Sequence, residues 1–336
     1  MKSKDFISRN VVLPLPTKAN PKVYLAVGSS KIATLSFSLY NPFSSKGKVL
    51  KWLAKLLFEK FNRFSLLLLP VVKNNHSDFI KYIEEQLGAE FISSVYIATA
   101  NDKVVLQLIK KDEIYGYLKF PLTKIGIERL ENEKKAIDIF SEKSMVSSLL
   151  YSGSYKGIPF IIIENIEGQI SELSKQDYLK LIPLFYKNNT FKLREHPRVI
   201  AILKELKLAN LRDLESWLWN IIKISELYYK EVYEHGDFAP WNIIQTDTGL
   251  VPFDFEYFEE TGLEYMDELK YHHQIETLLN LKEGEQLIDS ISSKINIPDF
   301  KILYQIFLIK EILRKIKIKE SVENEKILLN IISGKR

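Results

Sequence analysis

Three polar residues stand at short, fixed intervals in the segment from residue 235 to residue 254. Asp237 precedes the amide of Asn242 by five residues, and Asp254 follows Asn242 by twelve. Phosphoryl transfer uses such a set, with one aspartate beside the attacking hydroxyl and with an amide and a second aspartate holding Mg²⁺ on the nucleotide phosphates. Mg²⁺ prefers oxygen ligands and keeps several waters, so it takes only one or two carboxylates from a protein. The spacing therefore indicates a candidate site for phosphoryl transfer.

The residues around this set predict a hairpin. Residues 242–246 are typical of a strand, Asp247-Thr248-Gly249 of a turn, and residues 250–255 of a returning strand. A hairpin of that length can bring Asn242 and Asp254 to the same end. The alternative is a turn-rich loop whose polar side chains only cap neighbouring elements.

The segment His235-Gly236-Asp237-Phe238-Ala239-Pro240-Trp241-Asn242, with Asp254 closing the next strand, resembles the catalytic block of the aminoglycoside phosphotransferase and choline kinase family. That family shares the protein-kinase-like fold. The resemblance implies that Asp237 is the catalytic base, that Asn242 and Asp254 are the metal ligands, and that His235 braces the loop. In this family an aspartate on the following helix bonds the backbone of the catalytic loop, and Asp267 is the matching residue. At the start of a helix, its charge would also complement the macrodipole.

Upstream of this block the sequence pattern predicts three antiparallel strands and a helix, over residues 91–100, 103–110, 114–120 and 128–140. This order matches the nucleotide-binding small lobe of the family. The remainder is mostly helical, so we expect an α+β, bilobal protein-kinase-like fold with a small antiparallel-sheet lobe, a larger mainly helical lobe and an N-terminal α/β extension. The expected boundaries are 1–88 for the extension, 89–166 for the small lobe and 167–336 for the helical catalytic lobe.

Lys119 stands in the middle of the third predicted strand, in Tyr117-Leu118-Lys119-Phe120. The family places its phosphate-contacting lysine there and holds it with a glutamate of the next helix, so the resemblance assigns Lys119 and Glu133 to the nucleotide. A lysine bonds phosphate as a point charge. Glu131 is the alternative partner and lies on a different side of the helix. A solvated lysine on a half-exposed strand is the alternative to the whole assignment.

The resemblance alone implies two further nucleotide contacts. The turn from Ala98 to Lys103 falls where the phosphate-covering loop would lie, although it contains no glycine. Small residues can still let backbone N–H groups approach phosphate. The strand over 159–163 leads into Glu164-Asn165-Ile166, which resembles the segment that connects the lobes. Backbone groups at Glu164 and Ile166 are therefore expected to bond the adenine edge of ATP, and the choice of ATP over GTP is inherited from the resemblance.

Three other segments carry expectations about secondary structure. Residues 32–39 are predicted to form a strand. Residues 49–61 have helical periodicity, with Leu50, Leu53, Leu57 and Phe61 recurring at helical spacing. Residues 212–234 are predicted to form one helix that runs directly into the catalytic loop.

Composition excludes several classes of protein and site. The chain has 336 residues, of which 46% are apolar and 27% charged, and this suits a globular protein of two lobes. It contains no cysteine, which excludes disulfides, thiolate metal sites and cysteine nucleophiles. The net charge of +4 comes from interspersed charges, so no nucleic-acid-binding stripe is predicted. No membrane span or signal peptide is predicted. A cytoplasmic location is expected, and the oligomeric state stays open.

These observations and the resemblance predict an ATP- and Mg²⁺-dependent small-molecule kinase. The acceptor would be a hydroxyl of a sugar, amino sugar, amino alcohol or glycan-related molecule. An acidic cluster follows the metal aspartate and would either attract a cationic acceptor or form a solvated loop; it consists of Glu256, Glu259, Glu260 and Glu264. The alternative function is a catalytically weak, kinase-like nucleotide-binding or scaffolding module, which the glycine-free turn favours.

A histidine-rich Zn²⁺ site is a further alternative, because His272 and His273 follow on the helix that begins near residue 265 and could join His235, Asp237 and Asp254. Adjacent helical residues point about 100° apart, so both imidazoles cannot easily face one ion. The sequence therefore favours the Mg²⁺ assignment.

Overall fold

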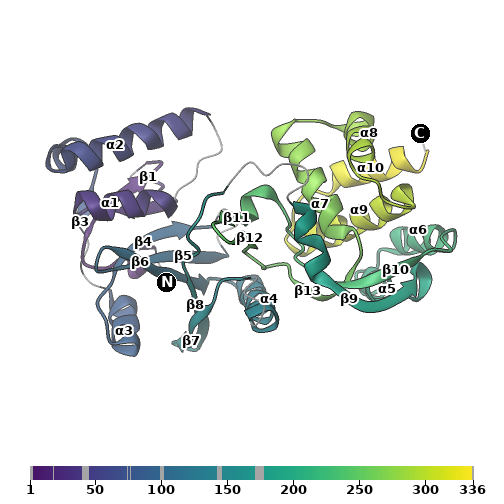
Figure 1. Ribbon diagram of the computed structural model, residues 1–336, viewed down its shortest axis with the longest axis horizontal. Coiled ribbons are helices and arrows are strands. Elements are labelled where there is room, and N and C mark those ends of the chain that lie inside the picture. The colour runs from purple at the N-terminus through teal and green to yellow at the C-terminus, as the bar shows by residue number, and fades with distance from the viewer. Residues whose placement is uncertain are drawn as a thin grey trace. The chain divides into compact units, whose positions relative to one another are not determined.

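The structure is a computed structural model that describes residues 3–17, 19–39, 45–73, 75, 77–98, 102–141, 146–170 and 178–334. The chain divides into two compact units, unit 1 (Met1–Glu167) and unit 2 (Gly168–Arg336). Unit 1 is built on one large antiparallel sheet, and unit 2 is mainly helical (Figure 1). The predicted α+β class, with one sheet-based part and one helical part, is confirmed.

The sheet of unit 1 has the strand order β3-β1-β2-β4-β5-β6-β8-β7, and every neighbouring pair is antiparallel. The three strands expected before the helix are present as β4, β5 and β6. Strands β1 to β3 come from the expected N-terminal extension and lengthen this same sheet. The bounds are β1 Val11–Leu15, β2 Val23–Ala26, β3 Val72–Lys73, β4 Ile92–Ile97, β5 Lys103–Lys110, β6 Glu113–Pro121, β7 Leu149–Tyr155 and β8 Ile158–Glu164.

Helices pack on this sheet through clusters of buried apolar side chains. Phe6, Phe79, Phe120 and Phe160 are fully buried, and Phe79 makes edge-to-face contacts with the other three rings. The helix that carries Phe79 begins after the N-cap Ser77 and ends at Gly88, whose φ of 60° is the left-handed conformation of a helix stop. The bounds are α1 Ser30–Ser36, α2 Ser45–Leu68, α3 Asp78–Leu87 and α4 Lys124–Phe140.

The strand predicted over residues 32–39 is wrong, because residues 30–36 form α1. The hydroxyl of Ser29 accepts a hydrogen bond from the Ile32 N–H at 3.2 Å and caps the helix. Ile32, Ala33 and Ser36 recur at helical spacing and are buried. The run of apolar and β-branched residues suits a strand locally, but the cap and the buried face select the helix.

Unit 2 combines a three-stranded antiparallel sheet of order β13-β10-β9, a β11–β12 hairpin and a set of helices around an Ile- and Leu-rich core. The strands are β9 Tyr186–Lys192, β10 Tyr228–Glu234, β11 Ile243–Thr246, β12 Gly249–Pro252 and β13 Glu259–Leu263. The helices are α5 Pro197–Leu208, α6 Arg212–Ile222, α7 Met266–Gln274, α8 Gly284–Lys294, α9 Phe300–Lys317 and α10 Glu323–Ile332, and a π-helical turn follows α7 over Ile275–Leu279. In the part of the chain that is described, no helix has the length and apolar character needed to cross a membrane.

The single helix predicted over residues 212–234 is wrong beyond Ile222. Helix α6 ends there, and residues 228–234 form β10 between β9 and β13. This segment reads Tyr-Tyr-Lys-Glu-Val-Tyr-Glu, and its aromatic and β-branched residues favour a strand. A strand, rather than a helix, therefore leads the chain into His235.

Candidate active site

Strand β10 ends at a tight turn that Asp267 holds from the first turn of α7. The Asp267 carboxylate accepts hydrogen bonds from the backbone N–H groups of His235 at 2.7 Å and Gly236 at 2.9 Å. Gly236 has φ of +76°, and a Cβ there would lie 2.2 Å from the backbone oxygen of Tyr257. A glycine is therefore required at this position. The contact implied for Asp267 by the motif is present.

The buried imidazole of His235 ties this turn to the strand end that precedes Asp254. Its Nε2 lies 3.0 Å from the Phe253 carbonyl oxygen, and its Nδ1 accepts a 3.4 Å contact from the Asp237 N–H. These partners select the neutral tautomer with the proton on Nε2. Burial lowers the pKa of His235 and outweighs the opposite influence of the Asp237 and Asp254 carboxylates. His235 is thus a neutral brace between the two segments that carry the acidic residues.

Asn242 and Asp237 are joined directly. The Asn242 Nδ2 donates to the Asp237 backbone oxygen at 2.8 Å and to its carboxylate Oδ2 at 3.1 Å. Both partners are acceptors, so the orientation of the amide is fixed. A short 3₁₀ turn over Pro240–Asn242 lies between them in sequence and makes the five-residue spacing compact. Among the described residues, the Oδ1 of Asn242 accepts no hydrogen bond.

The β11–β12 hairpin brings Asp254 to the same end as Asn242. Ile243 pairs with Pro252, and the Phe253 N–H donates to the Asn242 carbonyl at 3.0 Å, so Asp254 follows directly after this pair. Asp254 is half-buried and has φ of 66°, a left-handed conformation that aspartate tolerates better than most residues. The predicted hairpin is confirmed. One carboxylate and one amide oxygen at a hairpin end fit a cation that keeps several waters.

Two residues that contact Asp237 were not expected from the sequence. The Gln274 Nε2 donates to the Asp237 Oδ1 at 2.7 Å, and the Lys270 Nζ lies 3.8 Å from the same oxygen. They stand four residues apart on α7, so they share one helix face. Lys270 also pairs with the buried Glu311 at 2.8 Å. Asp267, Lys270 and Gln274 stand at i, i+3 and i+7, so the sequence places them on one face of α7 but does not relate that face to Asp237.

The carboxylate of Asp267 has an unusual electrostatic setting. Burial, and after it the nearby Glu234 carboxylate, raise the pKa of Asp267 to about 7, against the opposing effect of its two N–H donors and of Lys310. Lys310 forms an ion pair with Glu234. The hold of Asp267 on the turn at His235 and Gly236 therefore depends on the charge state of this buried group.

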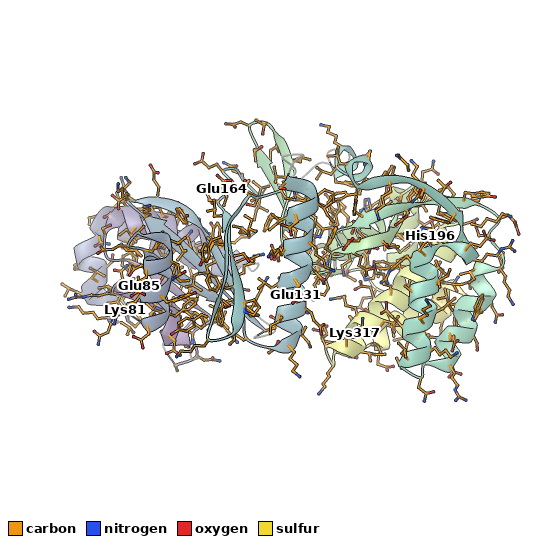
Figure 2. The ribbon with its side chains drawn as sticks, turned by 90° about the horizontal axis from the view of Figure 1, so that it is seen from below. Lys81, Glu85, Glu131, Glu164, His196 and Lys317 are labelled. Carbon is orange, nitrogen blue, oxygen red and sulfur yellow. The ribbon has the colours of Figure 1, made fainter. Side chains whose placement is uncertain are left out.

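In unit 1, Lys119 and Glu133 form a buried ion pair of 2.5 Å between β6 and α4. Their side chains are 7% and 3% exposed, so Lys119 is not a solvated surface lysine. Glu131, labelled on α4 in Figure 2, is exposed. The structure thus selects Glu133 over Glu131 as the partner of Lys119.

The segment Glu164–Ile166 lies at the end of β8, and its first residue, Glu164, is labelled in Figure 2. The Glu164 N–H donates to the Ser148 oxygen at 2.9 Å, and its carbonyl accepts from the Ser147 hydroxyl at 2.6 Å. These bonds engage the N–H and one acceptor site of the carbonyl of Glu164 within unit 1. Of the turn from Ala98 to Lys103, residues 99–101 lie outside the described residues.

The histidine-rich metal alternative finds no support. The His272 Nε2 lies 2.7 Å from the Tyr178 hydroxyl, whereas the His273 Nδ1 lies 2.9 Å from the Tyr304 hydroxyl. The two imidazoles therefore contact different tyrosines. Within the described ranges, no group of three or more His, Cys, Asp or Glu residues is placed to hold a metal ion.

The acidic cluster after Asp254 is engaged within the chain. Glu259 pairs with Arg198 at 2.6 Å, and Glu264 accepts from the Lys230 N–H at 2.9 Å. Glu256 and Glu260 also make interactions within the chain. This cluster is therefore neither a simple solvated loop nor a set of carboxylates reserved for a cationic acceptor.

Comparison with known proteins gives a likeness in structure and none in sequence. No family model matches the chain, and no curated protein matches it. An ethanolamine kinase of Plasmodium vivax is 14% identical, with a TM-score of 0.46, covering 90% of this chain and 93% of its own. A protein described as a fructosamine-3-kinase, from Haemophilus somnus, is 11% identical and has a TM-score of 0.44. The match covers 76% of this chain and 96% of that protein.

An aminoglycoside phosphotransferase of Streptomyces rimosus is 12% identical, with a TM-score of 0.45, covering 70% of this chain and 97% of its own. By their names, these neighbours are small-molecule kinases and phosphotransferases. The segment that begins with His235-Gly236-Asp237 resembles the catalytic block of such enzymes.

Proposed function

We propose that this chain is an ATP- and Mg²⁺-dependent small-molecule kinase that transfers the γ-phosphate to a hydroxyl of a sugar, amino sugar, amino alcohol or glycan-related acceptor. The acceptor oxygen forms the new bond to phosphorus, the bond to the β-phosphate oxygen breaks, and ADP leaves. The hydroxyl proton passes to the Asp237 carboxylate. Such catalysis depends mainly on positioning and electrostatics.

The observation that carries the proposal is the arrangement of Asp237, Asn242 and Asp254. The Asn242 amide nitrogen faces Asp237, so its oxygen is left for an outside ligand. Asp254 follows the backbone bond between Phe253 and Asn242. Bound Mg²⁺ would neutralise phosphate charge, and Asn242 and Asp254 are the residues that would hold it.

Lys119 is assigned to the nucleotide phosphates, with Glu133 as the residue that orients it. Their buried 2.5 Å pair supports this assignment, because a lysine held in one place can present its charge to an anion without reorganising. The backbone at Ile166 is assigned to the adenine edge. His235 and Asp267 position the turn that carries Asp237 and do not themselves react.

The test is phosphate transfer from ATP to a panel of sugars, amino sugars and amino alcohols, with the wild type compared with Asp237→Asn. Removing a positioned proton acceptor lowers the rate by about 10²–10⁴-fold. ATP binding and melting temperature should stay close to those of the wild type. Asp213→Asn, at an exposed aspartate on α6, is the matched control and should keep full activity. Equal transfer by wild type and Asp237→Asn would remove Asp237 as the base.

The alternative function is a nucleotide-binding or scaffolding module of weak activity. The turn from Ala98 to Lys103 favours it, because no glycine there eases the approach of backbone N–H groups to phosphate. It predicts ATP binding by the wild type without transfer to any acceptor of the panel.

A further inference from the structure

Helix α2 of unit 1 has an unusual surface. Nine of its large apolar side chains are between 36% and 84% exposed, and they are Val49, Leu50, Trp52, Leu53, Leu56, Phe61, Phe64, Leu67 and Leu68. The helical periodicity read from the sequence is confirmed, but Leu50, Leu53 and Phe61 of that pattern face solvent instead of the core. Exposed apolar surface of this extent marks an interaction site.

The opposite side of α2 is the one that anchors it. Phe58 and Ser65 are fully buried, and the Asn62 Nδ2 donates to the Val27 carbonyl at 3.1 Å. Glu59 accepts from the Thr34 hydroxyl of α1 at 3.1 Å. Figure 1 shows α2 at the periphery of unit 1, with α1 beside it. The helix is thus docked on unit 1 by one face, while a second apolar face is exposed in the part of the chain that the structure describes.

The uncovered face is a regular stripe. Val49, Trp52, Leu53 and Leu56 follow the i, i+3, i+4, i+7 spacing of one helix face. At about 100° per residue, these positions point within about 60° of the direction opposite Phe58. The helix bends at Phe61, where φ is −132° and ψ is 43°. Exposed apolar residues continue beyond the bend.

The same helix concentrates positive charge. The segment 45–68 contains six basic residues and one acidic residue, a net of +5, whereas the whole chain has a net of +4. Lys48 and Lys60 are exposed, whereas Lys51 and Lys55 are partly buried. At about 100° per residue, Lys60 falls within the stripe, Lys48 and Lys55 border one side of it, and Lys51 falls near Phe58 on the docked face. Burial, and then the neighbouring Lys55, lower the pKa of Lys51. The apolar stripe is therefore bordered by amines.

We propose that α2 is an interfacial helix that docks unit 1 on an anionic lipid bilayer surface. Its apolar stripe would enter the acyl boundary, and its lysines would meet acidic headgroups, which is the pattern of helices that lie in the membrane plane. Trp52 suits this position, since indole favours the interface between lipid and water. The lysines recur too often along α2 for it to cross the bilayer.

The positive charge of α2 also favours lipid over a second copy of the helix or a protein partner on the apolar stripe. A second copy of α2 on the stripe would bring two rows of lysines together, and like charges oppose that pairing. A protein partner would need an acidic groove shaped to a convex, bent helix, whereas lipid adapts its surface to one. The inference does not depend on the proposed function, because it concerns a surface outside the candidate site.

The test is flotation of the full chain with vesicles of phosphatidylcholine alone or of phosphatidylcholine and phosphatidylglycerol at 3:1. Binding is expected only with the anionic vesicles and should weaken in high salt. Leu53→Gln/Leu56→Gln and, separately, Lys48→Gln/Lys60→Gln should each lower binding by about tenfold or more. Anionic vesicles should shift the tryptophan emission of the wild type to the blue, and Trp52→Phe should lose that shift.

Matched controls come from exposed residues of unit 2. Leu208→Gln/Leu278→Gln and Lys204→Gln/Lys301→Gln change the same residue types and should bind as the wild type does. All these side chains are exposed, so melting temperatures should be unchanged. The proposal is overturned if the wild type fails to float with anionic vesicles, or if the α2 variants float as well as the controls.

Two other results would assign the stripe to another occupant and so overturn the proposal. One is a dimer in solution that dissociates in Leu53→Gln/Leu56→Gln while no vesicle binding is seen. The other is binding of soluble polyglutamate without vesicle binding, which would indicate an acidic protein surface.

Discussion

The side-chain amide of Asn242 donates from one nitrogen to both the backbone oxygen and the carboxylate of Asp237. This double contact fixes which end of the amide faces Asp237 and which faces outward. It couples the residue proposed to accept a proton to a residue proposed to hold Mg²⁺. A change at either position should therefore affect both groups, which makes Asp254 the cleaner position for testing the metal.

Asp254→Asn should abolish the Mg²⁺-dependent part of the rise in melting temperature that ATP produces. The substitution keeps the size of the side chain and removes the charge that a hard divalent cation needs. The measurement is thermal unfolding with ATP, in the presence of Mg²⁺ or of a chelator. Asp247→Asn, at an exposed aspartate in the turn of the same hairpin, is the control. An unchanged Mg²⁺-dependent shift in Asp254→Asn would remove the metal assignment.

Lys119 and Glu133 should behave as one unit in nucleotide binding. If Glu133 orients Lys119, then Lys119→Ala and Glu133→Ala should each weaken ATP use, and the double variant should lose less than the sum of the two. Lys119→Met and Glu133→Gln provide a second cycle with side chains of similar size. In both cycles each single variant leaves one buried charge alone, which costs about 3–5 kcal/mol of stability.

The control for this cycle is Glu131→Ala, an exposed glutamate two residues away on α4. It should leave ATP use unchanged. Strictly additive losses in both cycles would show that Lys119 and Glu133 do not act as a pair.

Much of the site could be predicted because its elements are set by local sequence. The β11–β12 hairpin follows from an Asp-Thr-Gly turn between two apolar runs. The pairing of Lys119 with Glu133 was implied by the resemblance, with Glu131 as the alternative partner, and the structure shows the pair with Glu133. The contact of Asp267 with the turn at His235 and Gly236 was accessible only through the resemblance. No local pattern relates residue 267 to residues 235 and 236.

The errors arose where tertiary packing decides the outcome. Residues 32–39 favour a strand by composition, but the Ser29 cap and a buried face stabilise α1. Residues 228–234 continue the apolar spacing of α6 and yet form the middle strand of a sheet. The contacts of Gln274 and Lys270 with Asp237 depend on how α7 packs, which the sequence does not state.

Gln274→Leu should lower kcat by about tenfold while leaving the affinity for ATP unchanged. The Gln274 donor holds the Asp237 Oδ1 at 2.7 Å, and a hydrogen bond to a charged group contributes about 1.5–3 kcal/mol. The measurement is steady-state kinetics with an acceptor found in the panel, together with calorimetric titration of ATP. Gln286→Leu, at an exposed glutamine on α8, is the control. A loss confined to ATP binding would contradict a role for Gln274 in orienting the base.

Glu311 should make the stability of unit 2 sensitive to acid. It is buried on α9 between Lys270 at 2.8 Å and Arg314 at 2.7 Å. Burial alone would raise the pKa of Glu311, but these two cations outweigh it and lower the pKa to about 2. A carboxyl whose pKa is lower in the folded state binds its proton more tightly when unfolded. Its contribution to the free energy of unfolding is therefore present above pH 4.5 and is lost as the pH falls toward 2.

The wild type should accordingly lose about 3 kcal/mol of unfolding free energy over that range from this group, at about 1.4 kcal/mol for each pKa unit. Glu311→Gln should lack this part of the pH dependence and should be less stable than the wild type at pH 7, because Lys270 and Arg314 lose their buried counter-charge. Urea unfolding at a series of pH values measures both effects, with Glu320→Gln at an exposed glutamate as control. If Glu311→Gln and the wild type show parallel pH profiles, Glu311 does not carry the acid sensitivity, and its pairing with Lys270 beside Asp237 is weaker than the geometry indicates.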